Sequence, residues 1–108
     1  MTTVTISDEG FWLQRFARIA DLRDPMERVA AASAEMDAIQ AHRELCSAVR
    51  GQAVLAVLKA GGRERDIVQA VGMSAGRVNQ VSHQAALTKA QSTQLINRAR
   101  RRAARTAG

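Results

Sequence analysis

The sequence predicts an all-α protein, from its composition, its apolar spacing and its helix-boundary residues. Only two Phe and one Trp are aromatic and Tyr is absent, so a core has to come from Ala, Val, Leu, Ile and Met. Apolar residues recur at steps of three and four, which is the period of a helix. The 108 residues suit one small domain. We divide it into regions 1–50, 51–97 and 98–108.

The region 1–50 is predicted to hold long helices. Residues 1–7 alternate polar and β-branched side chains, which fits a short arm, a strand or a frayed end. Helical spacing then continues through about Leu22, with Trp12 and Phe16 on the apolar face. Trp12 is either a stacking platform for a base or a core or dimer-interface anchor. Since no basic cluster adjoins it, we favour the anchor.

The next helix has a clear beginning. Asp24 is suited to cap it, Pro25 to occupy its first position, and Glu27 to complete a capping box. About 25 residues without Gly or Pro follow, or roughly 37 Å of helix, which exceeds what one small core covers. The excess apolar stripe predicts a homodimer formed by this region. The residues expected at the dimer interface are Trp12, Phe16, Val29, Met36 and Ile39.

Residues 25–60 are expected to form either one bent helix or two, with Gly51 as the favoured break, and residues 52–60 to act as a supporting helix ended by two glycines. Cys46 is expected to be a small buried side chain. Its spacing of four from His42 allows two metal ligands on one face, but no further residues complete a set. No metal and no cofactor is therefore expected.

Residues 63–84 are predicted to form two short helices joined by a tight turn. Ile67, Val68 and Val71 share one face of the first helix, and Gly72 follows where a left-handed residue ends a helix. Ser74 is suited to cap the second helix. The apolar anchors of that helix are Val78 and Val81, expected to pack against Ile67 and Val71.

This segment resembles the helix-turn-helix of bacterial DNA-binding proteins. The stretch GMSAGRVNQV is most similar to the reading helix of sigma-factor region four and of small regulators of the actinobacterial type. The resemblance covers about 22 of the 108 residues. It implies a tri-helical DNA-binding core in residues 51–97, whose second helix enters the major groove. At Val68 the family usually has Ala or Gly, which implies a wider helix crossing here.

Charge is uneven along the chain. Residues 1–50 carry six basic and eight acidic side chains, whereas residues 51–108 carry ten basic and two acidic ones. A basic half that contains the reading helix suits a polyanion. The residues expected to read bases are Ala75, Gly76, Arg77, Asn79 and Gln80. Those expected to contact phosphates are Arg63, Arg65, Ser74, His83, Arg98, Arg100, Arg101 and Arg102.

The end of the chain is rich in arginine. Ser92 or Thr93 is expected to cap a last helix from about Gln94. The tail 98–108 is expected to be disordered in the free protein and to add non-specific affinity for DNA.

These features favour a homodimeric regulator of transcription, from a bacterium, plasmid or phage, that binds double-stranded DNA at specific sequences and acts as a repressor or recruits polymerase. Two alternatives stay open: a module that binds RNA polymerase or a sigma-like partner through acidic N-terminal helices, and a non-specific nucleoid-type binder. Catalytic motifs are absent, so an enzyme is not expected. Few aromatic residues argue weakly against an effector pocket. The lack of an apolar run or signal sequence, and one cysteine, suggest a cytoplasmic, nucleoid-associated protein without a membrane segment.

Overall fold

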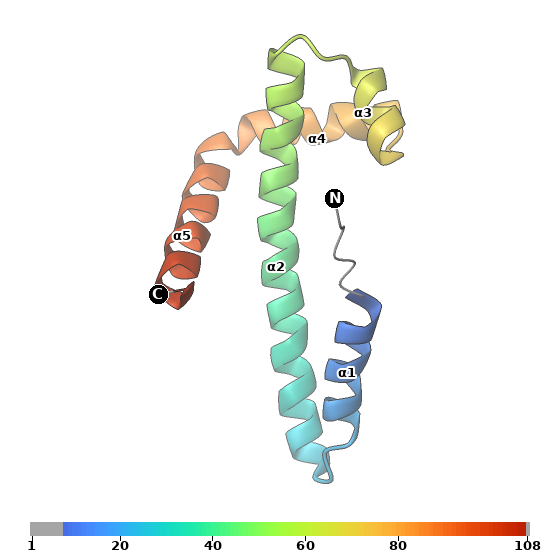
Figure 1. The fold of residues 1–108 in the computed structure, drawn as a ribbon, viewed down its shortest axis with the longest axis vertical. Coiled ribbons are helices and arrows are strands. Elements are labelled where there is room, and N and C mark those ends of the chain that lie inside the picture. Colours follow the sequence, from blue (N-terminus) through green and yellow to red (C-terminus); the bar gives the residue numbers. More distant parts are fainter. Residues whose placement is uncertain (1–7, 108) are drawn as a thin grey trace. The chain divides into compact units, whose positions relative to one another are not determined.

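The computed structural model describes residues 8–107, and these are all-helical, with no strand (Figure 1). Their helices are α1 (Asp8–Ala20), α2 (Pro25–Lys59), α3 (Glu64–Val71), α4 (Ala75–Leu87) and α5 (Lys89–Ala107). The all-α prediction is confirmed. The arm or strand predicted for residues 1–7 lies outside the described residues. In the described part of the chain, no helix has the length and apolar character needed to cross a membrane.

The chain divides into two compact units, residues 1–40 and residues 41–108, and each is described by itself. The first unit contains α1 and the beginning of α2. Asp24 Oδ1 accepts a hydrogen bond from the Met26 N–H at 3.2 Å, so the predicted cap of α2 is confirmed. Arg28 Nη1 donates to the Leu22 carbonyl oxygen at 2.8 Å, which ties α2 to the preceding loop. Arg15 of α1 and Glu35 of α2 form an ion pair, with 2.6 Å between Nε and Oε1.

The first unit leaves its large apolar side chains exposed. None of the residues whose burial is described in this unit is buried. Phe16 is 68% exposed and Met36 is 69% exposed. The ring centroids of Phe11 and Trp12 lie 5.2 Å apart in an edge-to-face arrangement, yet both side chains are exposed to solvent. A single copy of this unit therefore has no buried core of its own.

Helix α2 corrects two predictions. It runs without a break through Gly51, which is buried inside the helix. A glycine fits at this position because α4 packs closely against α2 there. A Cβ built on Gly51 would lie only 2.9 Å from the Cβ of Ala85. Cys46 is exposed rather than buried, because the buried face of α2 is formed by Ala48, Gly51 and Val54.

The core of the second unit lies where α2, α3 and α4 meet. It is formed by Val54, Ile67, Val78 and Val81, and Val78 is fully buried. Half-buried Leu58, Val68 and Met73 pack against these residues. Val71 was expected to belong to this core, but it is 61% exposed at the end of α3, where it lines an open hollow together with Val54 and Ile67.

Helix α5 is longer than expected. It begins at Lys89 rather than near Gln94, so Ser92 and Thr93 are not its caps. Thr93 Oγ1 instead donates to the Lys89 carbonyl oxygen at 2.9 Å and accepts from Gln52 Nε2 at 3.0 Å. The expected disordered tail is also wrong: residues 98–107 are helical, since Ala and Arg favour helix and no Gly or Pro interrupts before the end of α5.

Candidate nucleic-acid interface

Two capping interactions define the turn between α3 and α4. Gly72 is left-handed, with φ of 75°, and its N–H donates to the Val68 carbonyl oxygen at 2.9 Å. Ser74 Oγ then accepts a hydrogen bond from the Arg77 N–H at 3.1 Å. Both caps were predicted from the sequence and are confirmed. They fix where α4 begins, and therefore which of its residues face outward.

The outer face of α4 consists of Gly76, Gln80 and His83. These residues follow at steps of four and three, and so lie opposite the buried Val78 and Val81. All three are exposed. The structure therefore brings part of the predicted base-reading set onto one solvent-facing surface.

Gly76 has open space around it. A Cβ built there would meet no atom within 4 Å. Packing against α3 therefore does not require a glycine at this position, although glycine weakens a helix by about 1 kcal/mol relative to alanine. No contact within the described part of the chain therefore explains why this residue is a glycine.

The other predicted reading residues lie on the two flanks of α4. Asn79 is exposed on one flank, and its carbonyl oxygen accepts from Ser82 Oγ at 3.0 Å. Arg77 lies on the other flank, and its Nη1 donates to Gln80 Oε1 at 2.8 Å. Ala75 occupies the first position of α4 and is exposed. Arg77 and Gln80 thus form one pair, while Asn79 is separate from it.

The predicted phosphate contacts fall into two groups. Arg63 and Arg65 are exposed at the start of α3, where the Arg63 N–H donates to Asp66 Oδ2 at 2.9 Å. Ser74 lies at the start of α4, and its side-chain oxygen is used as the cap of that helix. His83 belongs to the outer face of α4 instead.

The second group lies on α5. Steps of three, one and three residues place four exposed arginines on the side of α5 opposite the buried Ile96. We call them the arginine stripe: Arg98, Arg101, Arg102 and Arg105. Arg100 lies outside the stripe. Like charges at these spacings destabilise an isolated helix by a few tenths of a kcal/mol per pair.

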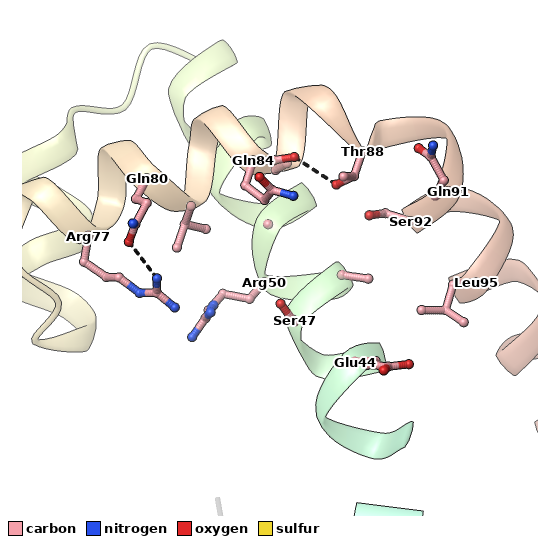
Figure 2. Close-up of a pocket in the computed structure, with 14 residues that line it drawn as sticks. Glu44, Ser47, Arg50, Arg77, Gln80, Gln84, Thr88, Gln91, Ser92 and Leu95 are labelled. Carbon is pink, nitrogen blue, oxygen red and sulfur yellow. Dashed lines mark hydrogen bonds between the residues drawn. The ribbon is translucent and has the colours of Figure 1, made fainter. Parts of the chain in front are cut away.

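A polar hollow lies beside α4, within the second unit, between α2, α4 and α5 (Figure 2). Its volume is about 490 Å³. Arg50 and Arg77 both line it, and their guanidinium groups point toward one another in Figure 2. Nothing in the sequence singled out Arg50, because it is far from Arg77 in the chain and lies in a helix assigned to the N-terminal region. The sequence argued weakly against a small-molecule pocket, and it did not indicate that these polar groups would line one space.

No known protein family, curated protein or solved structure matches the chain. Its resemblance to helix-turn-helix proteins therefore rests on the residues of α3, the turn and α4. The described residues also contain no group of three or more His, Cys, Asp or Glu side chains able to hold a metal ion.

Proposed function

We propose that the protein binds double-stranded DNA at specific sequences as a homodimer, with α4 in the major groove. The observation that carries this proposal is the outer face of α4, which is polar and exposed on a helix anchored by the fully buried Val78. The side chains of Asn79 and His83 have no bonding partner in the described part of the chain. A firmly held helix with unused hydrogen-bonding groups is suited to reading base edges.

Each reading residue has a distinct role in this proposal. Arg77 binds the O6 and N7 atoms of a guanine, and Asn79 or Gln80 pairs with an adenine. The Arg77–Gln80 hydrogen bond is exchanged for bonds to bases when DNA binds. Gly76 and Ala75 let the duplex approach the backbone of α4 closely. A good bidentate contact contributes roughly 1–3 kcal/mol of discrimination between bases.

Charge supports the same partner. Residues 41–108 carry twelve basic and three acidic side chains, whereas residues 1–40 carry four basic and seven acidic ones. The positive charge is thus concentrated in the unit that contains α4. Arg63, Arg65 and the arginine stripe bind phosphates, which positions the protein on the duplex without specifying its sequence.

The first unit supplies the dimer contact. Trp12, Phe16, Val29, Met36 and Ile39 are between 44% and 69% exposed in a single chain. Such a concentration of exposed apolar side chains is typical of a protein-interaction surface. A second copy of the same hairpin offers an equally apolar face, and a two-fold axis gives the isologous contact usual in homodimers.

The test is a selection of random duplex DNA by the purified protein at about 150 mM salt, close to physiological ionic strength. Enrichment of an inverted repeat with half-sites about 10–10.5 bp apart, or a multiple of this, is expected for a dimeric reader. Enrichment of a single half-site would support sequence-specific DNA binding but reject the proposed dimer geometry. Retention of all duplexes without enrichment would instead indicate a non-specific nucleoid-type binder.

A second candidate function is favoured by the exposed aromatic residues of α1. In this alternative Phe11, Trp12 and Phe16 bind a different protein, such as RNA polymerase or a sigma-like factor, together with the exposed acidic Asp37. It predicts no retention of DNA in the selection. It also predicts binding of polymerase that survives Arg77→Ala and is lost in Asp37→Asn.

A further inference from the structure

The polar hollow has the dimensions of a small-molecule site. Its volume of about 490 Å³ falls in the range usual for ligand pockets. It lies wholly within the second unit. Four of its lining residues are buried and give it an apolar inner side: Ala48, Gly51, Val81 and Ala85.

The two arginines that line this hollow have no ion-pair partner among the described residues. Neither Arg50 nor Arg77 forms an ion pair in the described part of the chain, and the one bond of the Arg77 side chain goes to the neutral Gln80. Glu44 also lines the hollow, but it is not paired with either arginine. The site therefore combines two positive charges with most of their N–H donors unused.

Neutral polar groups complete the lining. Ser47, Gln84, Gln91 and Ser92 surround the same space, and none of their side chains has a bonding partner among residues 8–107 (Figure 2). Thr88 already donates its hydroxyl hydrogen to the Gln84 carbonyl oxygen at 2.9 Å. Two side-chain amides and two hydroxyls are thus available to a ligand. They suit a ligand that both donates and accepts hydrogen bonds.

We propose that this hollow binds a small phosphate monoester, with its phosphate on Arg50 and Arg77. Two planar guanidinium groups match the charge and the three oxygens of a phosphate dianion, whereas a carboxylate is matched by one of them. The rest of the ligand contacts Gln84, Gln91 and Ser92 and covers the apolar inner side. A molecule of mononucleotide size fits these requirements.

The same phosphate chemistry is also present in a DNA backbone, so the test is made without DNA. Isothermal titration calorimetry of the full chain is performed with AMP, ribose 5-phosphate and inorganic phosphate, and with adenosine as the uncharged reference. One saturable site is expected for the phosphate esters, with adenosine bound far more weakly. The absence of saturable binding for all phosphate probes up to about 1 mM, which corresponds to roughly −4 kcal/mol, would overturn the proposal.

Three variants separate a built site from general attraction to a basic protein. Arg50→Ala is expected to weaken binding by about tenfold or more, as for a lost hydrogen bond to a charged group. Ser47→Trp keeps every charge but fills the hollow, and is also expected to remove binding. Arg43→Ala removes the same charge as Arg50→Ala from the same helix, outside the hollow, and is expected to bind as the wild type does. An equal loss in Arg43→Ala, or no loss in the other two, would overturn the proposal.

A measurement on the wild-type protein avoids dependence on the folding of variants. In a titration with AMP followed by amide NMR, shifts are expected at Ser47, Gln84 and Gln91. Shifts confined to the arginine stripe would instead show that the phosphate binds to α5. Because no DNA is present, a negative result here leaves the proposed DNA binding unaffected, and failure of DNA selection leaves this site intact.

Discussion

Gly51 of α2 lies directly against Ala85 of α4. A Cβ on Gly51 would lie 2.9 Å from the Ala85 Cβ, closer than two such atoms pack. Both residues are buried, and both line the inner side of the polar hollow. The missing side chain thus sets the distance between α2 and α4, and with it the separation of Arg50 from Arg77.

The first prediction compares one substitution at two helical glycines. Gly51→Ala should destabilise the protein by about 1–3 kcal/mol, because the added methyl group overpacks the crossing. Gly76→Ala should stabilise it by up to about 1 kcal/mol, because that position is open and alanine favours helix. Urea unfolding measures both. Ala85→Gly should partly rescue Gly51→Ala, and a lack of rescue would reject the contact as the cause.

The second prediction concerns Arg77. Arg77→Ala should reduce binding to the selected DNA sequence by about tenfold or more, the cost of one bidentate contact, with little effect on binding to random duplex. Arg43→Ala is the matched control, since it removes the same charge from the same unit. Fluorescence anisotropy measures both affinities, and circular dichroism checks the helical content. Unchanged specific binding in Arg77→Ala would reject α4 as the reading helix.

The third prediction concerns the arginine stripe. Replacing Arg101 and Arg105 by Ala should lower the slope of log K against log salt by about 2, since each phosphate contact contributes about 0.9. The preferred sequence should not change, because phosphates carry no direct sequence information. The control pair Arg18→Ala and Arg23→Ala removes equal charge from the first unit. The same change of slope in the control would mean that net charge alone is responsible.

The fourth prediction tests the dimer. Replacing Phe16 and Met36 by Ser should convert the protein to a monomer, because both side chains are more than two-thirds exposed in a single chain. Leu87→Ser removes a comparably exposed apolar side chain, 66% accessible, from α4 and should leave the assembly unchanged. Sedimentation velocity measures the mass of each. A monomeric wild-type protein would reject the homodimer directly.

The fifth prediction is a pH dependence of the first unit. The hydrogen bond from Arg15 lowers the pKa of Glu35 below its ordinary value, desolvation of the carboxylate opposes this, and the positive charge of Arg15 adds a smaller lowering. The stabilisation is therefore complete above the ordinary carboxyl pKa and is lost as pH falls through the lowered one. Glu35→Gln should abolish this part of the acid sensitivity, whereas Asp37→Asn on the same helix should not. Thermal unfolding followed against pH distinguishes the two variants.

Local chemistry made several elements predictable from sequence. Asp24 and Ser74 cap α2 and α4, and Gly72 ends α3, because capping depends on side chains within a few residues of the helix end. Buried Ile67, Val78 and Val81 were predictable because helical period places apolar residues on one face. The all-α class followed from the same two kinds of signal.

Three local expectations were wrong because tertiary packing decided them. Gly51 was expected to break a helix, but the approach of Ala85 gives a buried glycine a packing role. Cys46 is exposed because the buried face of α2 lies elsewhere, and Val71 is exposed because the hollow that it lines with Ile67 is open. A fourth expectation, the disordered tail, was wrong for a local reason: no Gly or Pro interrupts α5 between Lys89 and Ala107.

The sequence by itself determined where α2 and α4 begin, where α3 ends, that Val78 and Val81 are buried, and that the positive charge lies in the second half of the chain. Only the tertiary structure brought Arg50 of α2 beside Arg77 of α4 and lined the space between them with polar groups from α5. The physical reason is the sequence separation between the residues that determine each feature. Caps and helical faces depend on residues within about one turn, whereas a hollow depends on how closely helices remote in sequence pack.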